Sequence, residues 1–343
     1  PLYADTEFLY AVIDEAQYIK NPETKNARAV KTLKAKRRFA LTGTPVENSL
    51  AELWSIFDFL MPGYLFTYPK FRDTLETEVV RGNEEAAQRL SRRIKPFILR
   101  RLKTDVLKEL PPKTETDVLC PLIGEQRDLY AANLATVRES LTNAGERINK
   151  VAMLALLTKL RQICCEPTLA YAAYNGNSSK RDACLDLVRS ATAAGHKVLV
   201  FSQFTSMLEI LRTHLVQEGI THFLLQGDTP KVERVKLVSR FNADDTQVFL
   251  ISLKAGGTGL NLTGADVVIH YDPWWNESVM RQATDRAYRI GQDKPVQVYK
   301  LITKDSIEER IVELQQKKSA LSGIVMNAAA AQLRPEDILA LLD

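Results

Sequence analysis

The feature that most constrains this chain is a regular alternation of short apolar runs with amphipathic helical stretches over residues 180–304. The apolar runs are found in HKVLVFS, FLLQG, QVFLIS, DVVIHYD and VQVYKLIT. Strands that are apolar throughout are buried on both faces, and helical connections allow neighbouring strands to run parallel. The alternation therefore predicts an α/β fold with a doubly wound parallel sheet, in which functional residues gather at the carboxyl ends of the strands.

Length and composition narrow the possible classes of protein. The chain has 343 residues, which at roughly 100 to 200 residues per domain predicts two or three domains. No apolar run approaches the roughly 20 residues of a membrane-spanning helix, and the opening PLYADTEF does not resemble a signal peptide. The four cysteines form no C-x-x-C pair and the four histidines have no metal-ligand spacing, so we expect reduced thiols and no structural zinc. The net charge of +4 permits a polyanionic partner without requiring one.

Two adjacent carboxylates, Asp14 and Glu15, directly follow the apolar run FLYAVI. At the end of a strand, an aspartate can hold Mg²⁺ through water while a neighbouring glutamate polarises an attacking water molecule. Acidic residues also favour the positive end of a helix, and for an Asp-Glu pair taken by itself a helix start is the favoured interpretation. The dipeptide is thus a candidate hydrolytic site that needs support from other segments.

The segment LTGTP, residues 41–45, follows what we predict to be a short buried strand over residues 39–41. Thr42, Gly43 and Thr44 are suited to sensing a neighbouring phosphate, although an ordinary Gly-Pro turn would have the same residues. An amphipathic helix then begins behind Asn48 and stops at the Met-Pro-Gly sequence of residues 61–63.

The segment QATDRAYRIGQ, residues 282–292, offers two arginines in a regular pattern. Gln282, Arg286 and Arg289 recur at spacings of four and three, which predicts that they share one helical face. Two arginines on one face can clamp a γ-phosphate. The alternative is an exposed helix face in which the arginines pair with Asp285.

Three further features point to nucleic acid. The glycines of SLKAGGTGLNL let backbone amides approach a phosphate, but Lys254 precedes them and the P-loop pattern G-x-x-x-x-G-K-[ST] occurs nowhere in the chain. The run of residues 89–108 has eight Lys or Arg and one acidic residue, which fits a DNA-backbone contact or a solvated face equally well. Trp274 and Trp275 can stack on bases, although buried aromatic residues are commoner than base platforms.

In this order and spacing the motifs resemble those of the Swi/Snf-type family of helicase-like, DNA-dependent ATPases in helicase superfamily two. DEAQYIKN resembles motif II of that family, LTGTPVENSLAELWSIFDFLMPG its motif III region, and PFILRRLKTDVLKELPPK the basic block that follows. VLVFSQFTSMLEIL resembles motif IV, SLKAGGTGLNLTGADVVIHYDPWWN motif V with its extension, and RQATDRAYRIGQ motif VI. The resemblance covers nearly all of residues 8–315.

The resemblance implies ATP and Mg²⁺ as cofactors and assigns roles around the nucleotide. Asp14 would hold Mg²⁺ through water and Glu15 would activate the attacking water. Arg286 and Arg289 would act on the phosphates, with Gln282 and Gly259 contributing to nucleotide binding. Residues implied in coupling are Gln17, Thr42, Gly43 and Thr44.

The same resemblance implies double-stranded DNA as the partner, with a DNA-bound protein complex as a possible remodelling target, and a monomeric protein. Motif V would contact one strand of the duplex. The residues implied in DNA binding are Ser202, Gln203, Lys254, Gly256, Gly257, Thr258, Trp274, Arg100 and Arg101.

The resemblance also predicts two RecA-like lobes with helical insertions between them. Residues 1–63 would form the C-terminal part of lobe 1, 64–122 a helical insertion with the basic block and the end of that lobe, and 123–179 a second insertion whose linker begins at residue 172. Residues 180–304 would form lobe 2, followed over 305–343 by C-terminal helices that end in an amphipathic segment, LRPEDILALLD.

Two departures from the family pattern carry expectations of their own. Gln17 stands where many relatives have His, which affects the coupling between lobes but leaves the carboxylates intact. The Walker-type lysine loop of the family would lie upstream of residue 1, so we expect the chain alone to bind ATP poorly and hydrolyse almost none. A non-catalytic DNA- or protein-binding module and a strand-separating helicase are the alternatives. DEAQYIKN is closer to bacterial members, which favours a bacterial cytoplasmic protein associated with the nucleoid, or a nuclear one in a eukaryote.

Overall fold

The computed structural model describes residues 3, 5–43, 50–99, 101, 103–144, 150–256 and 259–325. The chain divides into two compact units. Unit 1 comprises Pro1–Arg101 with Leu314–Asp337, and unit 2 comprises Leu102–Glu313 with Ile338–Asp343. In the part of the chain that the structure describes, no helix has the length and apolar character needed to cross a membrane.

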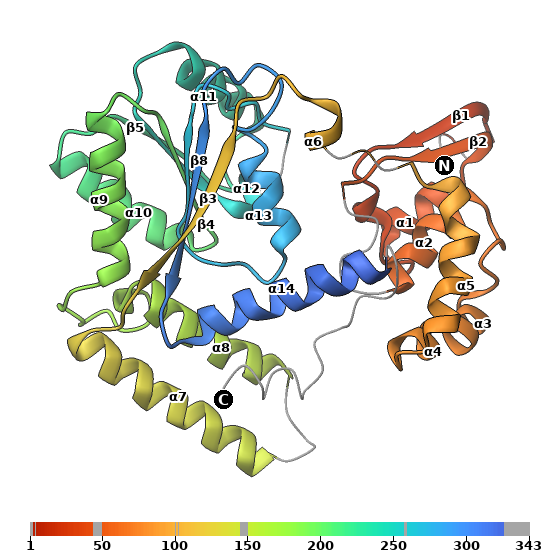
Figure 1. The fold of residues 1–343 in the computed structure, drawn as a ribbon, viewed down its shortest axis with the longest axis horizontal. Helices are drawn as coiled ribbons and strands as arrows, with labels where there is room; N and C mark the ends of the chain where they lie inside the picture. Colours follow the sequence, from red (N-terminus) through yellow and green to blue (C-terminus); the bar gives the residue numbers. More distant parts are fainter. Residues whose placement is uncertain are drawn as a thin grey trace. The chain divides into compact units, whose positions relative to one another are not determined.

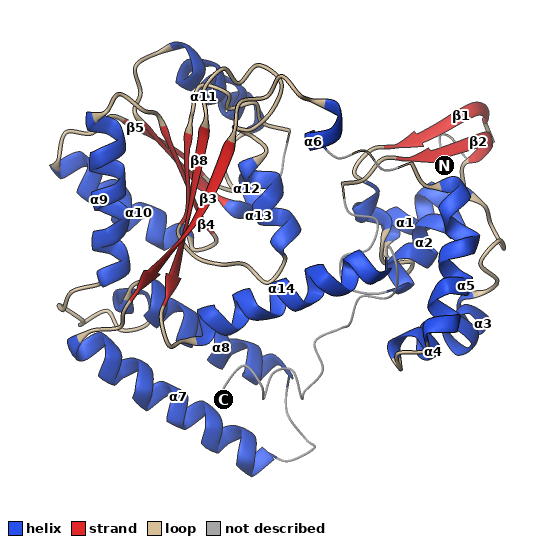
Figure 2. Ribbon diagram, viewed as in Figure 1, coloured by secondary structure: helices blue, strands red, loops and turns tan. Residues whose placement is uncertain are grey.

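Unit 1 contains a pair of parallel strands, β1 (Glu7–Ile13) and β2 (Lys34–Ala40), drawn as red arrows in Figure 2. The short helix η1 (Ala16–Ile19) and helix α1 (Lys25–Lys31) connect them. Ile13 lies opposite Ala40 in the register, so the two strands end together. The residues that follow each strand therefore lie at one edge of this sheet.

Helices make up most of the rest of unit 1. Their core packs leucine, phenylalanine and tryptophan side chains of α2 against those of α3 and α5, including Leu53, Phe57, Phe71 and Leu90. The predicted helix ending at residue 60 is confirmed, whereas Asn48 lies outside the described residues. The elements are α2 (Leu50–Leu60), α3 (Tyr68–Phe71), η2 (Arg72–Glu76), α4 (Thr77–Val80), α5 (Glu84–Ile94) and η3 (Lys95–Phe97).

The prediction of a short buried strand over residues 39–41 is wrong in two respects. The strand is longer and begins at Lys34, and the side chains of Phe39 and Leu41 are 49% and 54% exposed. The reason is that helices cover one face of the described two-stranded sheet. Ala11 and Ile13 pack there against a cluster that includes Phe59, while alternate residues such as Phe39 point to the other face.

Unit 2 is built on a six-stranded sheet in the order β3-β8-β7-β4-β6-β5, with every neighbouring pair parallel (Figure 1). The five strands predicted from the apolar runs are confirmed, and so is the doubly wound α/β fold. The strands are β3 (Lys113–Cys120), β4 (Val198–Ser202), β5 (His222–Leu225), β6 (Val248–Ser252), β7 (Val267–His270) and β8 (Val296–Thr303).

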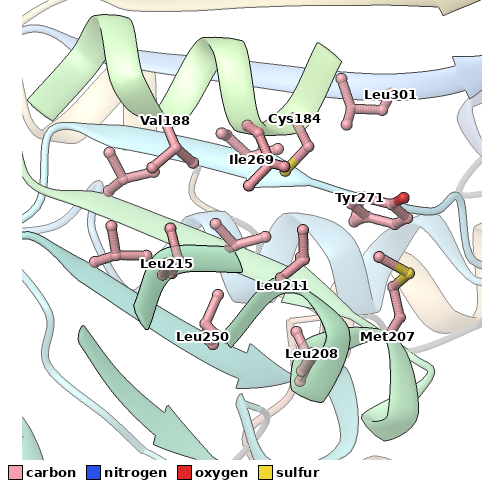
Figure 3. Close-up of a cluster of buried hydrophobic side chains, with 14 of the residues drawn as sticks. Cys184, Val188, Met207, Leu208, Leu211, Leu215, Leu250, Ile269, Tyr271 and Leu301 are labelled. Carbon is pink, nitrogen blue, oxygen red and sulfur yellow. The ribbon is translucent and has the colours of Figure 1, made fainter. Parts of the chain in front are cut away.

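Helices cover both faces of this sheet. Helices α9 (Ser179–Ala193) and α10 (Thr205–Gln217) share one buried cluster with strands β4, β6 and β7, in which Val188, Leu211 and Ile269 meet (Figure 3). Helices α11 (Lys231–Ala243), α12 (Leu253–Gly256) and α13 (Glu277–Thr284) share the cluster on the opposite face. Because side chains alternate between faces along each strand, each central strand contributes to both clusters.

The structure divides the chain differently from the predicted domains. Strand β3 lies within residues 64–122, which we expected to close lobe 1, yet it pairs with β8 along its whole length and forms an edge of the second sheet. The eight residues of β3 find backbone hydrogen-bond partners in β8, and β8 belongs to unit 2. Unit 2 also contains α6 (Lys103–Val106), α7 (Gly124–Ala144), α8 (Lys150–Cys165) and η5 (Pro167–Leu169), while α14 (Ile307–Val325) spans the boundary at residue 313.

The predicted linker at 172–180 is partly buried in unit 2, although Ala172, Ala173, Asn175 and Asn177 are exposed. Tyr174, Ser178 and Lys180 are buried, and the ammonium group of Lys180 donates to the carboxylate of Glu308. A buried ion pair of this kind requires both groups to be held in place, because either charge alone would be desolvated without compensation. The polar composition that suggested a linker therefore belongs to a packed turn.

Candidate functional site

The two carboxylates of unit 1 lie directly after β1, as predicted. The backbone amide of Glu15 donates to Oδ1 of Asp14 at 2.9 Å, and Glu15 itself adopts a left-handed conformation (φ 52°, ψ 55°). That conformation is uncommon for a residue other than glycine and is found at functional turns. The helix that follows is a single four-residue 3-10 turn in which the Glu15 side chain makes no capping bond. The geometry therefore does not support the alternative of a simple acidic helix start.

Gln17 connects Glu15 to the end of β2. Its amide nitrogen Nε2 donates to Oε2 of Glu15 at 2.6 Å, and its Oε1 accepts from the hydroxyl of Thr42 at 3.1 Å. The backbone amide of Ala16 donates to the Leu41 carbonyl at 2.9 Å, which holds the two strand ends together. We call Asp14, Glu15, Gln17 and Thr42 the carboxylate tip.

A side-chain amide can donate and accept hydrogen bonds at the same time, and Gln17 uses both capacities. The departure from the family pattern noted in the sequence thus retains a physical link between the carboxylates and Thr42. Gly43 follows Thr42 and is exposed, whereas Thr44 lies outside the described residues.

The donor set of the carboxylate tip fits Mg²⁺. Asp14 is exposed and one of its oxygens is oriented by the Glu15 amide. Mg²⁺ usually keeps several waters and takes one or two protein carboxylates together with substrate phosphates. The described residues contain no group of three or more His, Cys, Asp or Glu side chains placed to hold a metal ion. A single exposed carboxylate therefore suits a metal ion that arrives with a nucleotide.

In unit 2 five of the predicted DNA-binding residues lie at or after the ends of β4, β6 and β7, namely Ser202, Gln203, Lys254, Gly256 and Trp274. Ser202 and Ser252 lie opposite each other in the register of β4 and β6, and Phe201 lies opposite His270 of β7. We call residues 202–204, at the end of β4, and residues 272–275, which follow β7, the strand-end surface. The register places these strand ends at one edge of the sheet, while their contact with DNA stays a prediction.

Ser202 is fully buried, so its hydroxyl is not available at the strand-end surface. It donates to Oδ1 of Asp272 at 2.6 Å, and the backbone amide of Gln203 donates to the same oxygen at 3.2 Å. Burial raises the pKa of Asp272 to about 6, although Arg161 and the Ser202 hydroxyl oppose that rise. Ser202 and Asp272 thus fix the positions of their neighbours, among which Gln203 and Trp274 are half-buried.

Arg161 is a functional candidate that the motif reasoning missed. It lies in α8, is 3% exposed, and contacts both segments of the strand-end surface. Little in the sequence signalled Arg161, because it lies among other polar residues, Thr158, Lys159 and Gln162, in the stretch LALLTKLRQI. Burial of arginine is rare unless the guanidinium is paired.

The glycine-rich segment after β6 is described only in part. Lys254 is exposed on α12, which ends at Gly256, and Gly259 has a φ of +50° that favours glycine. Gly257 and Thr258 lie outside the described residues. The exposed lysine and the left-handed glycine are compatible with an approaching phosphate, but no described contact tests that role.

The predicted single helical face of Gln282, Arg286 and Arg289 is wrong. Helix α13 ends at Thr284, so only Gln282 lies on it and both arginines belong to the turns that follow. The backbone of these turns is bonded to another segment: the Leu262 amide donates to the Arg286 carbonyl at 2.9 Å. We call residues 285–292 the arginine turn.

The arginine turn is anchored by side chains as well. Nη1 of Arg289 donates to the Leu260 carbonyl at 3.3 Å, and Nε2 of Gln292 donates to the Ala265 carbonyl at 2.8 Å. Arg286 is buried, with 8% of its surface exposed. Residues 260–265 lead into the first residue of β7, so the arginine turn lies toward the amino-terminal edge of the sheet. Helix α13, which follows β7, thus carries the chain from the carboxyl end of that strand toward the opposite edge.

His270 connects β7 to the start of the arginine turn. Its Nε2 lies 2.8 Å from the hydroxyl of Thr284, and its ring stacks on Phe201 with centroids 5.7 Å apart. Burial is the main cause that lowers the pKa of His270 to about 3, and the charge of Lys300 adds to it. The imidazole is consequently neutral at physiological pH and holds Thr284 as a hydrogen-bond partner.

The basic run contributes one residue to the arginine turn. The ammonium group of Lys103 lies 2.7 Å from Oδ1 of Asp285 and donates to the Tyr288 carbonyl at 3.0 Å. Among the described contacts, Asp285 therefore pairs with Lys103 and not with the arginines beside it, contrary to the alternative left open by the sequence. Arg101 is exposed, and Arg100 lies outside the described residues.

Comparisons with known proteins agree with these arrangements. Residues 2–169 match a family model for the SNF2-related domain, and residues 179–291 match one for the helicase conserved C-terminal domain. The chain is 42% identical over 92% of its length to an uncharacterized ATP-dependent helicase of Mycoplasma genitalium. It is 40% identical over 92% of its length to the SWI/SNF-related matrix-associated actin-dependent regulator of chromatin subfamily A member 1 of Mus musculus.

A solved structure supports the same relationship at the level of the fold. The chain is similar to the SWI2/SNF2 ATPase core of Sulfolobus solfataricus in complex with dsDNA, with a TM-score of 0.55 and 39% identity. The match covers 93% of this chain and 69% of that structure. By contrast, the chain spans 30% and 32% of the lengths of the Mycoplasma and mouse proteins.

Proposed function

Because the chain belongs to the SNF2 (SWI/SNF) family of helicase superfamily two, we propose that this protein hydrolyses ATP to move along double-stranded DNA. Its α/β fold with parallel sheets is that of the SWI2/SNF2 ATPase cores, which are built from two RecA-like lobes. Relatives in this family include ATP-dependent helicases and a regulator of chromatin. A DNA-bound protein complex is accordingly a candidate target of the movement.

The observation that carries the proposal is the carboxylate tip. Asp14 offers an exposed carboxylate at a strand end, and Glu15 is held beside it by a left-handed turn and by Gln17. In the proposed reaction Glu15 orients and polarises the attacking water, and Gln17 keeps the Glu15 carboxylate in position. Mg²⁺ held at Asp14 through water would neutralise charge on the phosphate oxygens.

The arginine turn supplies the second part of the proposal. Arg286 and Arg289 would stabilise the negative charge that develops on the transferred phosphoryl group, as arginine fingers do in GTPases. Gln282, half-buried on α13, and Gly259 would add contacts to the nucleotide. These residues belong to unit 2, whereas the carboxylates belong to unit 1.

The strand-end surface and Lys254 support the DNA part of the proposal. A lysine contributes a sequence-independent phosphate contact, and half-buried tryptophans offer π-faces for stacking. Such contacts suit a protein that moves along DNA without reading its sequence. The structural relative was solved with dsDNA, which favours duplex DNA as the partner here as well.

The experiment is to measure ATP turnover of the full-length protein with and without duplex DNA, for the natural sequence and for Glu15→Gln. We expect duplex DNA to stimulate turnover and Glu15→Gln to reduce it by about 10³-fold while ATP binding is retained. Glu23→Gln is the matched control, because Glu23 is an exposed carboxylate of the same unit whose loss should leave turnover unchanged. Equal turnover for Glu15→Gln and the natural protein would refute the assignment.

One observation favours a second candidate function, that of a non-catalytic DNA-binding module. These 343 residues contain no G-x-x-x-x-G-K-[ST] pattern, so we propose that they hydrolyse almost no ATP by themselves. If the full-length protein also fails to hydrolyse ATP but binds duplex DNA, the chain is a non-catalytic DNA-binding module. Separation of the strands of a forked substrate would instead indicate a helicase.

A further inference from the structure

Arg161 is a buried guanidinium at the junction of three segments that are distant in the sequence. Its Nη1 donates to Oε1 of Gln203 at 3.0 Å and its Nη2 donates to the Pro273 carbonyl at 2.7 Å. Nη2 also lies 3.6 Å from Oδ2 of Asp272, close enough for an ion pair. One side chain of α8 thereby joins the segment after β4 to the segment after β7.

Three aromatic rings surround the same guanidinium. Its central carbon lies 5.7, 5.4 and 5.5 Å from the ring centroids of Phe204, Trp274 and Trp275. A cation within about 6 Å of an aromatic centroid is attracted by the ring, more strongly where water is excluded. Arg161 therefore contributes to the placement of both tryptophans.

Burying the charges of Arg161 and Asp272 costs free energy unless the two groups are paired. The exposed surface of Arg161 is 3% and that of Asp272 is 1%, so each charge depends on the other for compensation. A well-packed apolar residue would often serve stability equally well at such a position. What an apolar residue cannot do is hold Gln203 and Pro273 by directed hydrogen bonds from one planar group.

We propose that Arg161 is a positioning residue for duplex DNA, which fixes Gln203, Trp274 and Trp275 in the arrangement in which the strand-end surface meets the nucleic acid. This inference rests on the proposed function. Arg161 itself is too buried to reach a phosphate, so its effect on DNA is transmitted through the side chains that it holds. The Trp274 amide also lies 3.3 Å from Sδ of Met280 on α13, so displacement of residues 272–275 would reach the helix that carries Gln282.

The test compares duplex binding by the full-length protein and by the double variant Arg161→Met/Asp272→Asn, using a fluorescent duplex of random sequence. The double variant removes both buried charges together, so that neither is left uncompensated. We expect the dissociation constant for duplex to rise by about tenfold, the equivalent of roughly 1.4 kcal/mol. Lys159→Met is the matched control, because it removes a positive charge from the same helix at a side chain that packs on Tyr171 instead.

The salt dependence of binding separates positioning from direct phosphate contact. Each phosphate contact that is lost reduces the slope of log affinity against log salt by about one unit. Because Arg161 makes no phosphate contact under this proposal, we expect the double variant to bind more weakly with an unchanged slope. A slope reduced by about one unit would show that Arg161 contacts DNA directly and would overturn the proposal.

A second variant covers the case in which the double variant does not fold. Arg161→Lys retains the charge next to Asp272 but has one nitrogen in place of the guanidinium fork, so we expect an approximately threefold weaker affinity for duplex.

The possible outcomes distinguish this inference from the proposed function. If the natural protein binds no duplex, the proposed function fails. If it binds duplex and every folded Arg161 variant binds equally well, the positioning role fails while the proposed function stands.

Discussion

The carboxylate tip of unit 1 and the arginine turn of unit 2 contain the residues proposed to act on ATP, and the two segments are held in different ways. In the carboxylate tip Asp14 is exposed and the other three residues are half-buried, and Gln17 contacts Thr42, 25 positions away. The arginine turn includes a buried arginine and is fastened to residues up to 185 positions away, as Lys103 shows.

This difference predicts how substitutions in each segment will affect the protein. A reacting carboxylate must remain accessible to water and metal, so its support comes from a few local hydrogen bonds. An arginine that stabilises a transition state must keep one orientation, and packing with distant segments provides that restraint. Substitutions in the carboxylate tip should consequently act on chemistry, and those around the arginine turn on geometry.

The largest effect should come from the arginine turn itself. Arg286→Ala should lower duplex-stimulated turnover by about 10³-fold, the magnitude known for arginine fingers, while nucleotide binding changes much less. Arg281→Ala is the control, since Arg281 is exposed on α13 and pairs with Glu277. Steady-state turnover and nucleotide titration check this, with thermal unfolding to verify the fold. Equal losses of turnover in both variants would mean that turnover depends on total positive charge and not on the position of Arg286.

The next largest effect on turnover should come from Gln17, which joins Glu15 to Thr42 in the carboxylate tip. Gln17→Leu removes both the bond to Glu15 and the bond to Thr42, and a hydrogen bond to a charged group is worth about 1.5 to 3 kcal/mol. We expect turnover to fall by about tenfold with little change in thermal stability. His in place of Gln17 can also donate and accept, so Gln17→His should recover most of the loss. Failure of both variants to alter turnover would remove Gln17 from the site.

A smaller effect should follow from releasing Asp285. Lys103→Met deletes its ion pair, and the freed carboxylate can then compete for the arginines of the turn. Because both partners are more than a third exposed, solvent weakens the pair, and we expect turnover to fall only about threefold. Lys108→Met, at an exposed lysine of the same basic run, should have no effect in the same turnover measurement. A similar loss in both variants would assign the basic run a general electrostatic role.

The last effect concerns stability and is absent at neutral pH. The pKa of His270 is about 3 in the folded protein and near 6.5 when unfolded, so acid favours the unfolded state. Stability is retained above pH 6.5 and is lost toward pH 3, by about 1.4 kcal/mol per unit from this group. His270→Gln should reduce the slope of unfolding free energy between pH 6.5 and 5 by about that amount, measured by denaturant titration. Lys300, Glu115 and Lys113 influence the same histidine.

Elements made by local pattern were predictable from the sequence. The five apolar runs became parallel strands, and the motif II carboxylates lie at a strand end as expected. Predictions from helical periodicity were wrong where a helix ends. The spacing of Gln282, Arg286 and Arg289 fits a helix, but α13 ends at Thr284. The residues beyond it form short turns, and the Arg286 carbonyl accepts from the Leu262 amide of another segment.

Strand β3 illustrates a second reason why part of the fold could not be predicted from the sequence. KTETDVLC has few apolar residues, because a strand at the edge of a sheet is paired on one side and partly exposed. Its assignment to unit 2 depends on pairing with β8, which lies some 180 residues later in the chain. No local pattern contains that information.

The amino-acid sequence by itself determined the α/β class, the strands of unit 2 and the identity of the candidate chemical groups, because these depend on residue type and short-range periodicity. The tertiary structure alone decided which groups meet: Gln17 with Thr42, Lys103 with Asp285, and Arg161 with Gln203 and Asp272. Such pairings follow from the burial of charge and the closure of a sheet, which bring together residues whose separation along the chain carries no signal.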